Sequence, residues 1–231
     1  MLLFFIRFSA KSCLDSAWAR LHNQIQCECE QLAAHRSVAP PLLAQMLLVS
    51  GEDRRHGQHS GFDVRAIARA IWRNTTSRRR EGASTIEQQI VRVLTGRFER
   101  SLSRKVREIL LASLVAYTFP KAILPALYLR IGYYGWRMNG FEQACIRLRL
   151  SPASMTLSEA AELVARLKYP EPRVPPGYRL EQIRCRRDYL SRLHLTHLRD
   201  GTYDHIHPRW PSEAFHKGNS AVASARVVPA A

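Results

Sequence analysis

Apolar residues recur every three or four positions along most of the chain, a spacing that predicts α-helices. One clear example follows Asp63, a residue type suited to a helix N-cap, where an apolar stripe runs through Val64, Ile67, Ala68, Ile71 and Trp72. No segment keeps the strict alternation of a β-strand, and no internal repeat is visible. The pattern therefore predicts a mainly α fold.

Short signals predict where several of these helices begin and end. Residues 84–87 (Ser-Thr-Ile-Glu) and 156–159 (Thr-Leu-Ser-Glu) have the order of a capping box, in which a hydroxyl and a Glu satisfy free N–H groups. Gly96 is expected to end the first of these helices. Pro125 marks a first turn or a kink. A helix beginning at Ser101 or Ser103 is expected to turn four side chains inward: Val106, Ile109, Leu110 and Leu114.

The pattern divides the chain into three parts. Residues 1–40 read as an N-terminal extension with a membrane-proximal start, and residues 41–200 as one helical domain. Residues 201–231 are rich in Gly, Pro, His and Ala without a clear period, so a poorly ordered tail is expected there.

The charge is strongly one-sided. Lys and Arg number 35 against 19 Asp and Glu, a formal net charge of +16 with His neutral. Such a balance points to an anionic partner, namely a nucleic acid, a lipid surface or a phosphorylated substrate. A hydrophobic fraction of 46% excludes global disorder, and the odd number of cysteines, 5, argues against a disulfide scaffold.

No stretch approaches the roughly 18 apolar residues of a membrane-spanning helix. Residues 1–6 are apolar, but Arg7 and Lys11 follow them, whereas a secretory signal carries its basic residues before the apolar run. We therefore expect neither a clear transmembrane helix nor a signal peptide, and instead a disordered start or one that dips into a membrane surface.

Three polar clusters are candidates for chemistry. Residues 52–61 place a Glu-Asp pair beside two arginines and two histidines, between two expected helices. Residues 82–92 place free N–H groups at a helix start, followed by Gln89 and Arg92 on one helix face, which suits an anion. In residues 103–108, Arg104 and Lys105 precede Glu108 by four and three positions. Taken singly, each cluster can also be explained without a function: the first as an exposed turn, the second as a capped surface helix and the third as surface ion pairs.

Together and in this order, the clusters resemble the motifs of the peptidoglycan glycosyltransferase family, glycosyltransferase family 51. The motif E-D-x-x-F-x-x-H-x-G is matched by Glu52, Asp53, His59 and Gly61. The motif G-G-S-T-I-T-Q-Q-L-V-K-N is matched by Gly82, Ser84, Thr85, Ile86, Gln88 and Gln89, and R-K-x-x-E by Arg104, Lys105 and Glu108. Residues 127–135 and 157–161 resemble two further stretches of the family, so the likeness covers about residues 44–200.

The resemblance implies a lysozyme-like helical fold and an inverting displacement of polyprenyl pyrophosphate that polymerises a lipid II-type disaccharide donor into glycan strands. It implies Glu52 as the base and Glu108 as a second catalytic residue, with Asp53 and His59 in support. The residues implied to bind the pyrophosphate are Ser84, Thr85, Gln88, Gln89, Arg92, Arg104 and Lys105. No cofactor is required, although a divalent cation (Mg²⁺ or Mn²⁺) held by Glu108 is a candidate.

The implied partners are the lipid-linked disaccharide, the growing glycan strand, the membrane surface and other cell-wall synthases. The implied location is the outer, periplasmic face of the bacterial inner membrane. No S-x-x-K motif accompanies the glycosyltransferase motifs, so the expected enzyme is monofunctional.

Some motif positions differ from the family. Where the family has Phe, Gly and Thr, this chain has His56, Ala83 and Glu87, and where the family has Lys-Asn it has Arg92-Val93. The capping box gives a local reason for Glu87. A catalytically impaired member that binds lipid-linked glycan or a synthase partner is therefore the main alternative. A glycan hydrolase using Glu52 and Glu108 is a second. A nucleic-acid-binding protein using the basic runs at 78–80 and 184–187 is a third, but no recognised motif supports it and nucleic acid is not expected as a partner.

Overall fold

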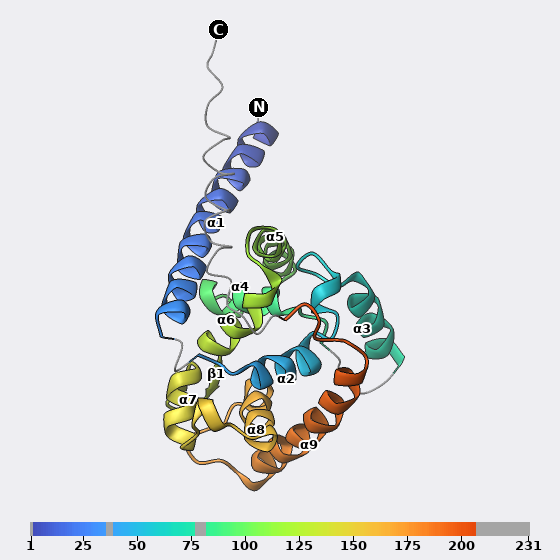
Figure 1. Ribbon diagram of the computed structural model, residues 1–231. Helices are drawn as coiled ribbons and strands as arrows, with labels where there is room; N and C mark the ends of the chain where they lie inside the picture. The colour runs from blue at the N-terminus through green and yellow to red at the C-terminus, as the bar shows by residue number, and fades with distance from the viewer. Residues whose placement is uncertain (1, 36–38, 77–81, 207–231) are drawn as a thin grey trace.

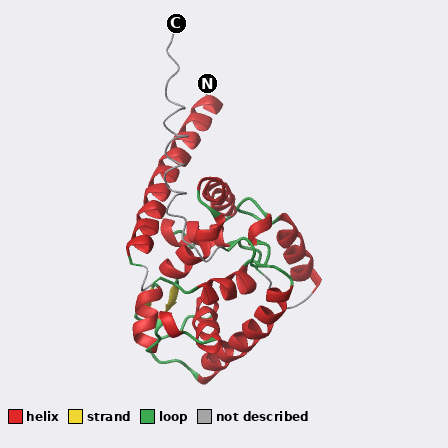
Figure 2. Ribbon diagram, viewed as in Figure 1, coloured by secondary structure: helices red, strands yellow, loops and turns green. Residues whose placement is uncertain are grey.

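The computed structural model describes residues 2–35, 39–76 and 82–206, and Figure 2 shows that helices dominate them. The α-helices are α1 (Leu2–Ala34), α2 (Leu42–Glu52), α3 (Val64–Thr76), α4 (Ile86–Thr95), α5 (Leu102–Thr118), α6 (Leu124–Ile131), α7 (Phe141–Leu148), α8 (Leu157–Lys168) and α9 (Gly177–Arg199). Within the described residues, single-turn 3₁₀ helices lie between them: η2 (His56–Gln58), η3 (Lys121–Ile123) and η4 (Pro152–Ser154). Strands β1 (Tyr133–Gly135) and β2 (Met138–Asn139) form a small antiparallel pair. The predicted mainly α fold is confirmed.

Helix α2 occupies the middle of the molecule, with α6, α8 and α9 packed around it (Figure 1). Ala44, Leu47, Leu48 and Val49 are all fully buried, which explains why this short helix is apolar on nearly every side. Its C-terminal residue is Glu52. The core therefore fixes the position of the first residue of the first polar cluster.

The core extends beyond both ends of the expected domain. Helix α1 projects far from the body in Figure 1, but its second half buries Leu21, Ile25 and Leu32 in the core, well before residue 41. At the other end, Tyr203 and Ile206 are buried after α9. The first part of the expected tail is thus packed, and residues 207–231 lie outside the described residues.

Tyr203 belongs to a buried polar network that joins the end of the described chain to α2. Its hydroxyl forms a short hydrogen bond with Ser50 Oγ and lies 2.9 Å from His194 Nδ1. His197 Nδ1 lies 3.0 Å from the same Ser50 Oγ. Burial lowers the pKa of both histidines, and Arg54 lowers that of His197 further.

Most of the predicted helix ends are confirmed. Asp63 accepts N–H groups of the first turn of α3, and Thr156 forms the complete capping box of α8. Gly96 ends α4 in a left-handed conformation, and Pro125 lies in the first turn of α6. The capping box expected at Ser84 is wrong: Thr85 caps α4 by accepting the N–H of Gln88.

The inward face predicted for α5 is also wrong in part. Val106 and Leu110 are 58% and 48% exposed, whereas Leu111, Ala112 and Val115 are buried. Helix α5 is apolar on two sides. Helices α4 and α1 cover only one of them, the side that also carries the buried Glu108. The stripe predicted on α3 likewise leaves Val64 and Trp72 exposed.

No helix within the described ranges is by itself long and apolar enough to cross a membrane. Helix α5 and the segment Lys121–Ile131 reach that length and composition only as a pair, bent by 111°.

Candidate active site

Glu52 is held in place from two neighbouring helices. Gln89 Nε2 of α4 donates to Glu52 Oε2 at 3.2 Å, and Arg186 Nη2 of α9 donates to Glu52 Oε1 at 3.0 Å. The same Arg186 nitrogen donates to the Gly51 carbonyl at 2.7 Å. The Glu52 side chain remains 20% exposed, so its carboxylate is oriented and still reachable.

The surroundings of Glu52 include both a pocket and a buried phenol. A pocket of about 280 Å³ is lined by Glu52, Asp53, Ser84 and Thr85, among others, so the first two sequence clusters share one cavity. Burial and the Glu52 carboxylate raise the pKa of Tyr128, a residue of α6. Such a phenol stays protonated at neutral pH.

Asp53 ties the loop after α2 to the start of α4. It accepts from His59 Nε2 at 2.9 Å and from the Ile86 backbone N–H at 3.1 Å. Burial alone would raise the pKa of Asp53, but His56 and His59 outweigh it, so the pKa lies well below its usual range. A permanent carboxylate at a helix N-terminus is stabilised by the helix dipole.

Gly61 brings the second motif close to the first. Its carbonyl accepts the Thr85 hydroxyl at 2.7 Å. Its φ is +91°, and a Cβ placed there would lie 2.3 Å from the Ala112 carbonyl oxygen of α5. Only glycine allows this approach.

The third cluster surrounds one carboxylate with positive groups. Glu108 is buried and accepts from Arg92 Nε and Nη2, both at 3.0 Å, from Lys105 Nζ at 2.7 Å, and from Arg104 Nη1. Burial raises the pKa of Glu108, but the hydrogen bonds from Arg92 and Lys105 lower it more, so the net shift is downward. Three cations facing one carboxylate leave about two positive charges for an anion.

Helix α4 connects this basic cluster to Glu52. Ser84 Oγ accepts from Arg92 Nη2 at 3.1 Å and from Lys105 Nζ at 3.2 Å. Gln88 Oε1 accepts from Lys105 Nζ at 2.6 Å, while the adjacent Gln89 reaches Glu52. The structure thus gathers the predicted residues into two neighbouring groups that one helix joins.

A second cavity opens beside the basic cluster, with a volume of about 370 Å³, between α1, α4 and α5. Its lining includes Arg20, Arg92, Arg97, Arg104 and Arg107 together with Glu108. This concentration of guanidinium groups is suited to an anion such as a phosphate or pyrophosphate.

The comparison with protein families agrees with this arrangement. The model of the family described as Transglycosylase matches residues 20–194, which covers both polar groups. The chain belongs to the transglycosylase family. The match begins inside α1, in agreement with the burial of the second half of that helix.

Relatives of known name give the same result. A biosynthetic peptidoglycan transglycosylase of Cronobacter sakazakii is 35% identical over 151 residues, 64% of this chain and 61% of that protein. That of Thiobacillus denitrificans is 31% identical over 150 residues, 64% of each chain. Penicillin-binding protein 1A of Rickettsia typhi is 31% identical over 147 residues, 62% of this chain but 19% of that protein. The aligned part of the chain thus spans less than two thirds of each of these relatives.

Within this transglycosylase domain, Glu108 does not suit a divalent cation. Both of its oxygens already accept hydrogen bonds from positively charged groups. A divalent ion there would be a fourth cation and would add two more positive charges at contact distance. The positively charged side chains around Glu108 suit an anion rather than Mg²⁺ or Mn²⁺.

Sequence reasoning missed or misassigned several site residues. In the sequence Arg186 is only part of a basic run, because nothing local links it to Glu52, 134 positions away. The capping role expected for Glu87 is wrong: Glu87 is buried, pairs with Lys121, and lies 3.4 Å from His56 Nδ1. Of the other basic residues considered for nucleic acid, Arg187 pairs with Asp188, and residues 78–80 lie outside the described residues.

Proposed function

We propose that this transglycosylase domain polymerises a polyprenyl-pyrophosphate-linked disaccharide, a lipid II-type donor, into peptidoglycan glycan strands. The observation that carries the proposal is the pairing of one oriented, reachable carboxylate with a basic cluster one helix away. A displacement of pyrophosphate needs these two things, namely a base for the incoming hydroxyl and positive charge for the leaving group. The names of the transglycosylase relatives support the same reaction.

In the proposed step, a sugar hydroxyl of the acceptor attacks the anomeric carbon of the donor while Glu52 takes the hydroxyl proton. The new glycosidic C–O bond forms as the anomeric C–O bond to pyrophosphate breaks, and the pyrophosphate leaves with the electron pair. A single displacement inverts the configuration at that carbon. Arg92, Arg104 and Lys105 bind the charge that develops on the leaving group.

Asp53 and Glu108 act as positioning residues in this account. Asp53 holds the Glu52 loop against α4, and Glu108 holds the basic side chains together. A hydrolase would need Glu108 as a proton donor, which requires a raised pKa, whereas the pKa of Glu108 is lowered. This observation disfavours the Glu52–Glu108 acid/base pair of the hydrolase alternative.

The test is incubation of the purified chain with fluorescent lipid-linked disaccharide, with products separated by size. The proposal expects a ladder of glycan strands, whereas the impaired-enzyme alternative expects binding of the lipid-linked donor and no polymer. Lys105→Ala should weaken binding of a lipid-pyrophosphate analogue about tenfold or more, because a charged hydrogen bond is lost. Arg184→Ala is the control, since Arg184 is exposed and forms a long, solvent-exposed ion pair with Glu181 at 3.8 Å.

We also propose that the chain works at the outer face of the bacterial inner membrane, where its lipid-anchored donor and growing strand lie beside other cell-wall synthases. Leu102, Val106, Leu110 and Tyr117 form an exposed apolar stripe on α5, and the net charge of +16 favours anionic lipids. Flotation with anionic vesicles should recover the chain at low salt, less at high salt, and less again for Val106→Asp with Leu110→Asp. Recovery in the soluble fraction at every salt concentration would contradict this part of the proposal.

A further inference from the structure

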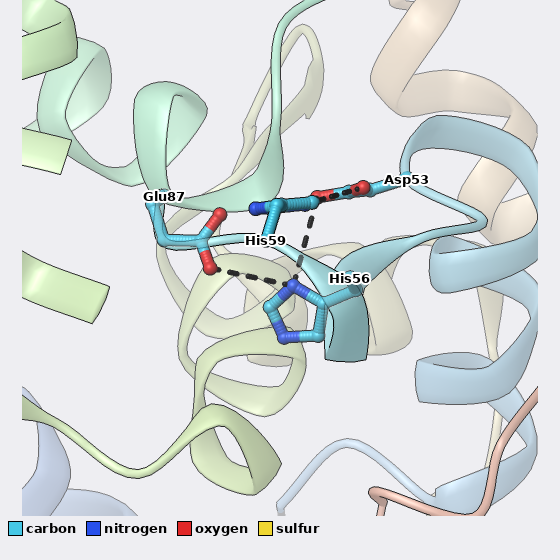
Figure 3. Close-up of side chains that lie close together, drawn as sticks. All are labelled: Asp53, His56, His59 and Glu87. Atoms are coloured by element: carbon cyan, nitrogen blue, oxygen red, sulfur yellow. Dashed lines mark hydrogen bonds and ion pairs between the residues drawn. The ribbon is translucent and has the colours of Figure 1, made fainter. Parts of the chain in front are cut away.

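Four ligand-type side chains meet beneath the loop that follows α2. Asp53, His56, His59 and Glu87 each offer one atom suited to a metal ion, and these atoms lie within 4.8 Å of one another. Figure 3 shows His56 pointing between the carboxylates of Asp53 and Glu87, with His59 beside them. Asp53, His56 and Glu87 are buried, whereas the neighbouring Glu52 carboxylate is reachable.

The hydrogen bonding of His56 leaves one ring nitrogen facing the carboxylates. Its Nε2 lies 3.1 Å from the Lys121 carbonyl oxygen, which only accepts, so Nε2 carries the proton. Its Nδ1 is buried, has no hydrogen-bond partner among the described residues, and faces Glu87 Oε1 at 3.4 Å and Asp53 Oδ2 at 3.6 Å. In the charged ring, a second proton on this nitrogen faces the two carboxylate oxygens. In the neutral ring a lone pair faces them instead, and a metal cation between them would take the place of that proton.

The two distances from His56 Nδ1 suit a shared metal better than a shared proton. His59 Nε2 and Asp53 Oδ1 lie 2.9 Å apart as a hydrogen-bonded pair, which a bound metal would replace. An N–H···O hydrogen bond is about 2.7–3.2 Å long, shorter than either contact of Nδ1. Two ligands bound tetrahedrally at about 2.0–2.1 Å from Zn²⁺ lie about 3.3 Å apart, close to both. Metal-bound histidines typically donate their other N–H to a backbone carbonyl or carboxylate, as His56 does to Lys121.

The charge of the cluster leaves room for a divalent ion. Asp53 and Glu87 contribute two negative charges, and the Lys121 ammonium contacts Glu87 Oε1 and lies 3.5 Å from His59 Nδ1. Glu87 Oε2 is buried and accepts no hydrogen bond from the part of the chain that the structure describes. The Lys121 side chain is 22% exposed, so it can turn toward solvent when another cation takes its place.

We propose that Asp53, His56, His59 and Glu87 form a binding site for a divalent transition-metal ion, Zn²⁺ first among them. Two imidazoles and two carboxylates are a donor set that Zn²⁺ accepts, and four protein ligands make a closed, structural site. The ion would fasten η2 to the first turn of α4, next to Glu52. His56 and Glu87 are two of the positions where this sequence differs from the family motifs, which have Phe and Thr there.

The test uses the full chain stripped of metal with a chelator and titrated with Zn²⁺, with bound metal measured after desalting. We expect one Zn²⁺ per chain, a rise in melting temperature that chelator reverses, and a tetrahedral visible spectrum with Co²⁺ as the probe. His56→Phe and the nearly isosteric Glu87→Gln should each lower the Zn²⁺ affinity at least about tenfold. His35→Gln, which changes an exposed histidine at the end of α1, should leave it unchanged.

The Lys121→Met variant tests whether a metal ion or the Lys121 ammonium is the cation that balances the negative charge of this cluster. The proposal predicts tighter Zn²⁺ binding by this variant, because a competing positive charge is removed. It is overturned if the unmutated chain binds no Zn²⁺, or if His56→Phe and Glu87→Gln, shown to be folded by circular dichroism, bind it as tightly as the unmutated chain. Glycan polymerisation is not a readout, so these outcomes do not depend on the proposed function.

Discussion

Arg186 of α9 donates a hydrogen bond to Glu52 of α2, although the two residues are far apart in the sequence. One guanidinium nitrogen lies 3.0 Å from Glu52 Oε1 and 2.7 Å from the Gly51 carbonyl oxygen, across 134 and 135 positions of the chain. It therefore joins the side chain that carries the proposed chemistry to the backbone that ends α2. The orientation of the Glu52 carboxylate depends on how α9 packs on α2.

Arg186→Met is expected to lower kcat about tenfold, with a smaller effect on KM for the lipid-linked donor. The variant keeps most of the aliphatic stem but loses both hydrogen bonds, so the carboxylate loses its fixed geometry. Arg184→Met, a change at an exposed position of the same helix, is the matched control. Polymerisation at the unmutated rate by Arg186→Met would show that Arg186 has only a structural role.

Gly61→Ala is expected to destabilise the fold by about 2 kcal/mol or more, because the added Cβ meets the Ala112 carbonyl at a positive φ. Urea unfolding followed by circular dichroism measures this. Gly177→Ala is the control, since a Cβ there would lie in open space, with no atom of the described residues beyond its chain neighbours within 4 Å. Equal unfolding midpoints for the two variants would contradict the close approach of Gly61 to α5.

The sequence predicted local features well, because their causes are local. The caps at Asp63 and Thr156 and the end of α4 at Gly96 follow from residue types that satisfy free backbone groups or accept a left-handed turn. The ion pairs of Arg104 and Lys105 with Glu108 follow from helical spacing alone.

The errors share one physical reason, which is dependence on residues far away in sequence. Helix α5 has apolar residues on two sides, and only tertiary packing decides that Leu111 rather than Leu110 is buried. Thr85 takes the cap of α4 because Ser84 accepts from Arg92 and Lys105 instead. Long-range packing, not periodicity, decides these choices.

Acid should destabilise the chain before its carboxylates are protonated. Burial lowers the pKa of His194 and His197, so both are neutral in the folded chain, whereas the unfolded chain binds protons below about pH 6.5. The unfolded state then holds more protons, and the free energy of unfolding falls as pH drops through about 6.5 toward the folded pKa values. Urea unfolding at pH 7.5 and 5.5 measures this loss.

A control variant identifies the groups responsible for this pH effect. His197→Gln removes one of the two histidines of the Ser50–Tyr203 network, so its unfolding free energy should change less between the two pH values than that of the unmutated chain. His35→Gln, at an exposed position, should keep the full change. An identical pH dependence for both variants would contradict the assignment to the Ser50–Tyr203 network.

The rate of glycan polymerisation by Glu52→Gln, measured beside binding of a lipid-pyrophosphate analogue, tests the proposed mechanism most directly. Gln keeps the size of the side chain but cannot take the proton of the acceptor hydroxyl. The account predicts a rate lower by about 10²–10⁴-fold, the usual contribution of a positioned base, with analogue binding nearly unchanged because the basic cluster is intact. Polymerisation by Glu52→Gln at the rate of the unmutated chain would contradict the assignment of Glu52 as the base.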